Sequence, residues 1–342
     1  MKKLPVLVGG ATAAVAAVAT TLTLGLGTAE PSPRPTPSRS LPIPPAATPH
    51  AAAVDAANRH GLRVWLEADL VKRWQAGPES LNEAAMIVGG LARRKGVVGI
   101  KIADEIGYRD GLDSPAKVRR FLTDARAALR RTAPGKPVLV DAIVPELGCM
   151  PNYQPPLRWA TICAAQARGR YPQLALDEFD GYVRDGFFDI LDLSTGLLPD
   201  RTYGGWGIEP QTAQRTAWAE VHRRGWDKHV RLQSRKALAH PGAYTATDTD
   251  QAMDTFVDIP LAEGATAVDI WTWRQVYQGQ VYRLLDPGLE RNALWQALVE
   301  RRTQGVTLFT HLSPRSLEVG LDADLKVITE AFTDLFVAAG TG

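Results

Sequence analysis

The sequence predicts an α/β fold, a TIM-like (β/α) barrel, over residues 51–342. Short segments rich in β-branched residues alternate there with longer amphipathic segments, which is the pattern of parallel strands joined by helices. Seven predicted strands are found, one fewer than a closed eight-stranded barrel needs. No Gly-x-Gly-x-x-Gly sequence follows any of them, so an open dinucleotide-binding sheet is not expected. The barrel is therefore predicted to be incomplete or permuted, or to hold one strand that the pattern hides.

The predicted strands and helices follow one another with a regular spacing. The strands are expected at 62–70, 97–105, 137–146, 187–195, 229–238, 266–275 and 305–313. The helices are expected at 51–60, 79–95, 114–133, 157–185, 209–225, 248–263, 289–303 and 320–339. The clearest helix starts at Ser114-Pro115, a capping residue followed by proline in the first turn, and is stopped by Pro134-Gly135.

The first 50 residues are not expected to belong to the barrel. Lys2 and Lys3 precede an uncharged segment, residues 4–29, which ends in small residues; this is the pattern of a secretory signal. Because the segment is long enough to cross a bilayer, an uncleaved membrane anchor is the alternative for residues 1–29. Residues 30–50 are rich in proline and predict an extended linker. We therefore expect a protein that is secreted or anchored on the outer face of the cell membrane.

Composition and charge exclude several classes of protein. Hydrophobic residues make up 45% and charged residues 22% of the 342 residues, which excludes wholesale disorder and a multi-span membrane protein. Lys and Arg number 39 against 37 Asp and Glu, so no nucleic-acid partner is expected. The histidines show no metal-ligand spacing, and no metal or other cofactor is expected. A monomer with a carbohydrate substrate or ligand is the expected state.

Alternation along each predicted strand places polar side chains on one face. Residues at positions i and i+2 point to the same side of a strand, and in all seven strands one side carries polar or ionisable groups. A barrel needing only stability would fill its interior with branched apolar residues. Because buried charge is costly, we expect a polar cavity lined by tryptophan at the carboxyl ends of the strands. The alternative is an internal salt-bridge network with a purely structural role.

Several carboxylates beside indole rings suit a sugar ligand, whose ring faces stack on aromatic side chains. Glycoside hydrolysis needs two carboxyl groups about 5–10 Å apart. Glu105, beside Asp104 at a strand end, is the predicted acid, and its partner stays open among Glu67, Asp141, Asp192 and Asp269. The candidate catalytic residues are Glu105, Asp104, Asp192 and Asp141. The candidate substrate-binding residues are Glu67, Asp69, Arg231, Gln233, Arg235, Asp269, Trp271, Trp273 and His311, although His311 could instead be structural.

Three segments resemble the clan A glycoside hydrolases, which are (β/α)8 barrels. The sequence RKGVVGIKIADEIGY at 94–108 resembles the clan's fourth strand, which ends in Asn-Glu with Glu as acid/base; here it ends in Asp104-Glu105. The sequence AANRHGLRVW at 56–65 resembles the third strand and the helix before it. Ile270-Trp271-Thr272-Trp273 resembles the final strand, where a tryptophan floors the sugar site. The resemblance implies hydrolysis of glycosidic bonds with Glu105 as acid/base.

The sequence departs from the clan in two ways. The clan's nucleophile is a glutamate on the seventh strand, whereas the matching segment 230–235, VRLQSR, contains no carboxylate. The clan's first two strands have no counterpart before residue 56, and segment 305–339 could supply one by permutation. We therefore expect an exported glycoside hydrolase-like barrel acting on a polysaccharide or cell-wall glycan. The alternatives are a catalytically inactive glycan-binding barrel and an anchored scaffold.

Two cysteines, Cys149 and Cys163, flank a predicted loop. In an exported protein they are expected to form a disulfide, and two buried thiols are the alternative.

Overall fold

The computed structural model describes residues 48–155, 157–242 and 244–341. The predicted signal or anchor at 1–29 and nearly all of the predicted linker lie outside the described residues. Within the described part, no helix has the length and apolar character of a membrane span.

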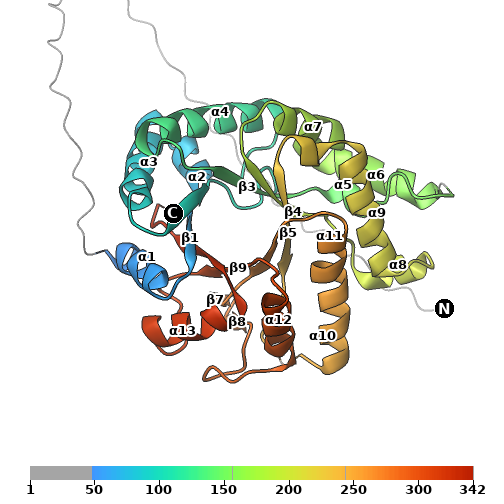
Figure 1. The fold of residues 1–342 in the computed structure, drawn as a ribbon. Helices are drawn as coiled ribbons and strands as arrows, with labels where there is room; N and C mark the ends of the chain where they lie inside the picture. The colour runs from blue at the N-terminus through green and yellow to red at the C-terminus, as the bar shows by residue number, and fades with distance from the viewer. Residues whose placement is uncertain (1–47, 156, 243, 342) are drawn as a thin grey trace, which may run out of the picture. The chain divides into compact units, whose positions relative to one another are not determined.

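The described residues contain a closed barrel of eight parallel strands (Figure 1). The strands are β1 (Arg63–Glu67), β2 (Val97–Lys101), β3 (Val138–Ile143), β4 (Ile190–Ser194), β5 (Arg231–Ala237), β6 (Val268–Trp271), β9 (Leu308–Leu312) and β10 (Asp334–Ala338). Their order around the barrel is β1-β10-β9-β6-β5-β4-β3-β2, and β10 closes it by pairing with β1, Arg63 opposite Asp334. The predicted α/β barrel is confirmed, and it is complete.

The eighth strand corrects the sequence prediction. A single helix was expected over 320–339, whereas the structure has α13 (Leu321–Ala331) followed after two residues by β10. Phe332 and Thr333 connect them without glycine or proline, so the apolar spacing of the helix runs into the strand and hides the boundary. Because β9 and β10 lie between β6 and β1, the C-terminal part of the chain fills the two positions that seemed to be missing.

Helices cover the outside of the barrel (Figure 1). They are α1 (Pro49–Arg59), α2 (Leu70–Gln75), α3 (Pro78–Ala92), α4 (Pro115–Thr132), α5 (Pro145–Gly148), α6 (Arg158–Arg170), α7 (Leu176–Arg184), α8 (Asp200–Gly205), α9 (Pro210–Arg223), α10 (Ala246–Met253), α11 (Ile259–Ala262), α12 (Ala293–Thr303) and α13. Short helical turns lie at Pro172–Leu174 (η1), Trp226–Lys228 (η2) and Asp254–Asp258 (η3), the last a π-helix joining α10 to α11.

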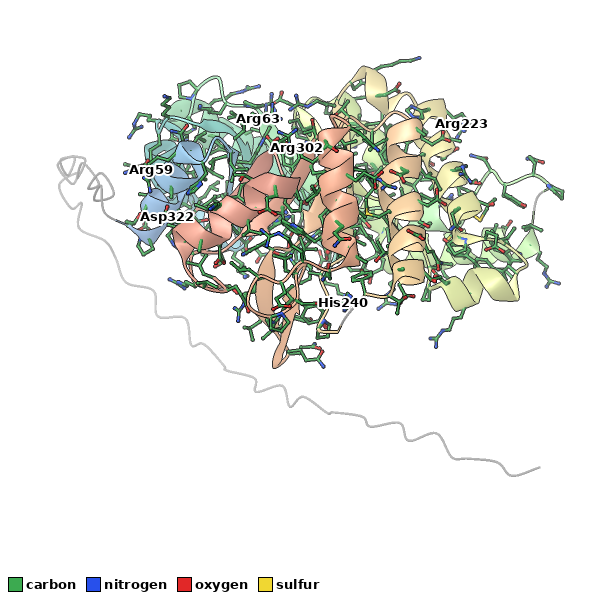
Figure 2. The ribbon with its side chains drawn as sticks, turned by 60° about the horizontal axis from the view of Figure 1, so that its bottom comes forward. Arg59, Arg63, Arg223, His240, Arg302 and Asp322 are labelled. Carbon is green, nitrogen blue, oxygen red and sulfur yellow. A yellow bond between two sulfur atoms is a disulfide. The ribbon has the colours of Figure 1, made fainter. Side chains whose placement is uncertain are left out.

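Local sequence signals place these helices. The side chain of Ser114 accepts a hydrogen bond from the backbone N–H of Lys117 and caps α4, as its sequence predicts. The apolar face of α4 is buried. The first and last helices, α1 and α13, lie side by side, and an exposed ion pair joins Arg59 to Asp322 at 3.7 Å (Figure 2).

The barrel interior has two levels. Near the amino ends of the strands an apolar cluster fills it, formed by Trp65, Leu139, Ile190, Ala267, Phe309 and Phe336. Toward the carboxyl ends the inward side chains are ionisable. The strand register places these ionisable residues at the same height in the barrel, since Asp141 pairs with Asp192 and Arg235 pairs with Asp269. Apolar packing thus closes one end of the barrel and leaves the polar groups at the other.

Candidate functional site

Among the described residues, seven barrel strands each contribute one ionisable side chain to a polar layer inside the barrel. We name it the polar layer; it consists of Glu67, Lys101, Asp141, Asp192, Arg235, Asp269 and His311, from β1, β2, β3, β4, β5, β6 and β9. Asp104 and Glu105, in the loop after β2, lie at its upper edge and bind Arg235. Alternation along the strands brings these side chains together, as predicted.

Lys101 is fully buried at the centre of this layer. Its Nζ lies 3.0 Å from Glu67 Oε1, 3.0 Å from Asp104 Oδ1 and 3.2 Å from Asp141 Oδ2. Burial acts to lower the pKa of Lys101, but the carboxylates, that of Asp104 above all, outweigh it and hold the pKa well above the usual value. Lys101 therefore carries a permanent positive charge that ties three strands and the β2 loop together.

Arg235 holds the second set of carboxylates. Its Nε lies 2.8 Å from Asp141 Oδ2, its Nη1 2.9 Å from Glu105 Oε1 and its Nη2 3.2 Å from Asp104 Oδ1. A planar guanidinium presents donors in fixed directions, so this contact fixes the orientation of both acids at the strand end. Asp104 bridges Lys101 and Arg235, and these cations overcome burial to hold the pKa of Asp104 well below its usual range.

His311 lies between two carboxylates. Its Nδ1 is 3.0 Å from Glu67 Oε1 and its Nε2 is 2.8 Å from Asp269 Oδ2. Burial acts to lower the pKa of His311, but Asp269 and Glu67 outweigh it and raise the pKa to about 9. Lys101 and His311 in turn overcome burial to lower the pKa of Glu67 to about 2. At neutral pH His311 is therefore a cation and Glu67 an anion.

Replacement of His311 by glutamine is expected to destabilise the fold by an amount that shrinks at alkaline pH. Since the folded-state pKa is about 9 against 6.5 for the free side chain, the charged imidazole stabilises the fold fully below 6.5, and this contribution disappears as the pH rises through 9. The shift corresponds to about 3 kcal/mol. Urea unfolding of both proteins at about pH 6 and about pH 10 measures the difference. An equal difference at both values would contradict a charged His311.

Asp141 and Asp192 lie too deep to meet a substrate directly. Both are fully buried, and neither lines the cavity above the layer. Burial raises the pKa of Asp192, and neighbouring Asp269 and Asp141 raise it further. Burial likewise raises the pKa of Asp141, even against Arg235 and Lys101. A protonated Asp192 can donate a hydrogen bond to Asp269, so these predicted catalytic residues lie where they support the layer.

A cavity of about 480 Å³ opens above the polar layer, at the carboxyl ends of the strands. Its acidic lining residues are Glu67, Asp69, Asp104 and Glu105, and its basic ones are Arg235, Arg274 and His311. Trp271, at the end of β6, contributes an indole, and the hairpin of β7 (Arg274–Tyr277) and β8 (Gln280–Arg283) forms part of the wall. Carboxylates and an aromatic side chain therefore share one solvent-accessible space, as the sequence predicts.

Two carboxylates of the cavity, Glu67 and Asp104, lie close together because both contact Lys101. Glu67 Oε1 and Asp104 Oδ1 each lie 3.0 Å from Lys101 Nζ, so the two oxygens are at most about 6 Å apart. Glu105 follows Asp104 directly and has a φ of +50°, in the left-handed region that costs a glutamate energy. Such strain concentrates at functional sites, and here it aims an acid at the cavity.

Four predicted substrate-binding residues do not line the cavity, and one of them, Asp269, is buried in the polar layer beneath it. Arg231 and Gln233 line a space at the opposite end of the barrel, because they precede Arg235 by four and two residues on β5. Trp273 is buried outside the barrel, where its Nε1 donates to Asp324 at 2.9 Å. It was expected to share the direction of Trp271, but β6 ends at Trp271 and strand alternation ends with it.

Lys101 is not among the candidate site residues of the sequence analysis, although its place on β2 puts it inside the barrel. The sequence nevertheless indicated a role for this lysine, since a lysine within an apolar strand must be paired with an acid to be buried. The structure also joins Cys149, after α5, to Cys163 of α6 by a disulfide. No group of three or more potential metal ligands occurs among the described residues.

The fold and the site define a (β/α) barrel with a charged cavity at the carboxyl ends of its strands. No family model and no curated protein matches the chain. Among solved structures, a protein assigned as a sugar phosphate isomerase/epimerase, from Anabaena variabilis, is 13% identical with a TM-score of 0.44, over 81% of this chain and 83% of that one.

Two further solved structures are also similar to the chain. A 2,3-dimethylmalate lyase is 14% identical with a TM-score of 0.36, over 86% of this chain and 82% of that one. The exo-β-1,4-mannosidase Op5Man5 from Opitutaceae bacterium strain TAV5 is 11% identical with a TM-score of 0.42, over 70% of this chain and 43% of that one.

Proposed function

We propose that the protein is an exported glycoside hydrolase that cleaves a polysaccharide or cell-wall glycan in the cavity above the polar layer. The observation that carries the proposal is the meeting of Glu67, Asp104 and Glu105 around one cavity that also holds the indole of Trp271. The sequence pattern of residues 1–29, typical of a secretory signal or a membrane anchor, is what supports export in this proposal.

The cavity narrows the choice of the second carboxyl group. Of the four partners that the sequence leaves open for Glu105, Glu67 lines the cavity, whereas Asp141, Asp192 and Asp269 are fully buried beneath it. Glu67 is ionised at neutral pH, because its pKa is lowered to about 2. We therefore assign Glu67 as the base or nucleophile.

Glu105 is assigned as the proton donor. Arg235 contacts its Oε1, which leaves Oε2 without a hydrogen-bond partner among the described residues. In the reaction a proton passes from Glu105 to the glycosidic oxygen, the bond from that oxygen to the anomeric carbon breaks, and water is added to that carbon. Where Glu67 acts as base, it takes the proton of the attacking water.

The test is an assay of reducing ends released from a panel of purified polysaccharides by the wild-type protein. Release from at least one polysaccharide, with a pH profile set by carboxyl groups, is the expected result. Binding without release would favour the second candidate, a non-catalytic glycan-binding barrel. That candidate is favoured by one feature, since β5 carries Arg235 and no carboxylate at the cavity. If the protein neither releases reducing ends nor binds any of the polysaccharides, the assignment to glycans is wrong.

Trp271→Ala is expected to raise KM about fivefold on the polysaccharide that is cleaved, because a stacked sugar ring loses about 1 kcal/mol of aromatic contact. Trp273→Phe is the matched control, since Trp273 is buried outside the barrel and should leave KM unchanged. Initial rates over a range of polysaccharide concentrations measure both variants. An unchanged KM for Trp271→Ala would remove the indole from the substrate site.

A further inference from the structure

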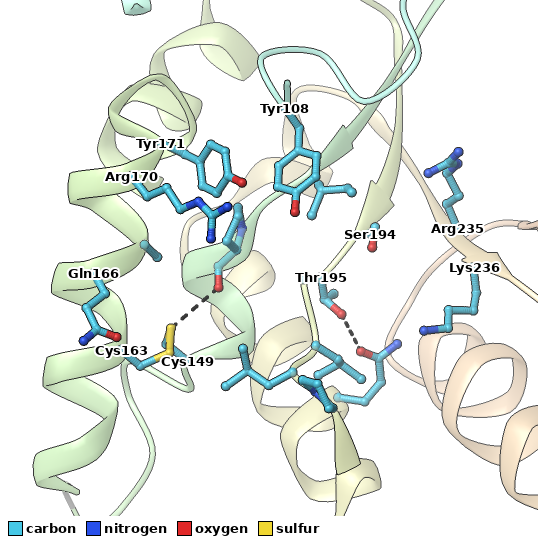
Figure 3. A pocket seen from close by; sticks show the side chains of 18 of the residues that line it. Tyr108, Cys149, Cys163, Gln166, Arg170, Tyr171, Ser194, Thr195, Arg235 and Lys236 are labelled. Atoms are coloured by element: carbon cyan, nitrogen blue, oxygen red, sulfur yellow. Dashed lines mark hydrogen bonds between the residues drawn. A yellow bond between two sulfur atoms is a disulfide. The ribbon is translucent and has the colours of Figure 1, made fainter. Parts of the chain in front are cut away.

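A second cavity, of about 410 Å³, lies beside the first and is drawn in Figure 3. Arg235, whose guanidinium binds Asp104 and Glu105, lines both cavities, so the two cavities adjoin at this side chain. We name it the second cavity. The β4 end with Ser194 and Thr195, the disulfide between α5 and α6, and the loop with Tyr108 form its walls. A polymer cleaved in the first cavity could extend into this space.

The two cavities differ in charge. The first is lined by four carboxylates, whereas the residues that line the second include no Asp or Glu. Its ionisable lining consists of three cations, Arg170, Arg235 and Lys236, and two tyrosines, Tyr108 and Tyr171. Arg235 is already neutralised by the acids of the first cavity. The second cavity therefore depends on the other two cations for its charge.

Lys236 is the half-buried cation of the second cavity, whereas Arg170, which likewise has no acid within ion-pair distance among the described residues, is exposed. No carboxylate lies within ion-pair distance of its Nζ among the described residues, and its ammonium sits 4.1 Å from the ring centre of Phe256. Burial lowers the pKa of Lys236, and Asp200 opposes this only from outside contact distance. A partly buried ammonium facing a cavity without a counter-ion favours an anion from outside.

Neutral donors complete the anion site. The hydroxyl of Thr195 donates to Gln214 Oε1 at 2.6 Å, which leaves the Nε2 of Gln214 free to donate into the cavity. Tyr108 and Tyr171 pack with their ring centres 4.7 Å apart on the opposite wall, where the guanidinium of Arg170 lies over Tyr171 (Figure 3). The cavity thus offers donors to an anion and ring faces to a sugar.

We infer that the second cavity binds an acidic substituent of the glycan, a carboxylate, sulfate or phosphate, with Lys236 as its specificity-determining residue. The inference rests on the proposed function, since it names the class of substrate that this function would act on. An acidic sugar in the second cavity places its neighbour beside Arg235, in the first cavity with Glu105 and Glu67. Lys236 takes no part in bond cleavage.

Calorimetric binding to the full chain tests the inference. The probes are tri-galacturonate, its neutral methyl ester, glucose 6-sulfate and glucose 6-phosphate. At least one acidic probe is expected to bind, and the one that binds identifies the substituent. Lys236→Met should weaken that binding about tenfold, because it removes a charged hydrogen-bond donor but keeps the apolar stem. Lys228→Met, at an exposed lysine of η2, is the control and should bind as the wild type does.

Three outcomes would overturn the inference: no acidic probe binds, tri-galacturonate is the probe that binds but its neutral methyl ester binds as tightly, or folded Lys236→Met keeps wild-type affinity. Thermal unfolding of each variant shows that it is folded. Because calorimetry measures binding without turnover, the result for the second cavity does not depend on whether the protein hydrolyses glycans. A protein that binds the acidic probe through Lys236 but releases no reducing ends would contradict the hydrolase alone.

Discussion

Glu105→Gln is expected to abolish measurable hydrolysis, lowering kcat by about 10²- to 10⁴-fold, because general acid catalysis contributes a factor of that size. The amide keeps the shape of the side chain and can still accept a hydrogen bond from Arg235, which contacts Glu105 Oε1 at 2.9 Å. It has no proton of suitable acidity for the glycosidic oxygen. Initial rates on the best polysaccharide of the panel measure the change.

The control for this variant is Glu79→Gln, an exposed glutamate in the first turn of α3, which should leave kcat unchanged. Affinity for the polysaccharide should also survive in Glu105→Gln, because the lining of the cavity stays in place. A folded Glu105→Gln protein with wild-type kcat would show that another group donates the proton. Asp104, bound to the same guanidinium, would then be the residue to replace.

Strand alternation predicted the polar layer because it is a local rule that needs no knowledge of distant contacts. It placed Glu67, Asp269 and His311 inside the barrel, and the structure brings all three into contact. The same rule went wrong for Trp273, where the chain leaves β6 after Trp271 and turns outward. The end of a strand depends on the pairing partner, and a single sequence does not show it.

The sequence also did not show how far along the barrel axis each inward side chain lies. Alternation gives the same direction to Arg231, Gln233 and Arg235, yet only Arg235 reaches the cavity, because the two earlier residues lie nearer the amino end of β5. Strand β10 was hidden for a related reason, since Phe332 and Leu335 continue the apolar spacing of α13. Strand β10 becomes evident only in the folded structure, where Asp334–Ala338 pair with β1 and close the barrel.

Lys101→Met is expected to destabilise the fold by about 3–5 kcal/mol, the loss seen when one member of a buried ion pair is removed. Methionine fills most of the space of the lysine stem, so the loss is electrostatic rather than steric. Without the ammonium, Glu67 and Asp104 lose their counter-ion at 3.0 Å and Asp141 loses one at 3.2 Å. Urea unfolding at neutral pH measures the difference in free energy.

Lys117→Met is the matched control, because Lys117 pairs with Asp113 at 2.8 Å on the surface, where solvent screens the pair and its loss should leave stability nearly unchanged. The double variant Lys101→Met/Asp141→Leu should be less destabilised than the sum of the two single variants, since it removes a buried charge together with its partner. Strictly additive losses would show that Lys101 and Asp141 act independently. The polar layer would then be stabilised by packing around each residue, and its carboxylates would not need the lysine to stay ionised beneath the cavity.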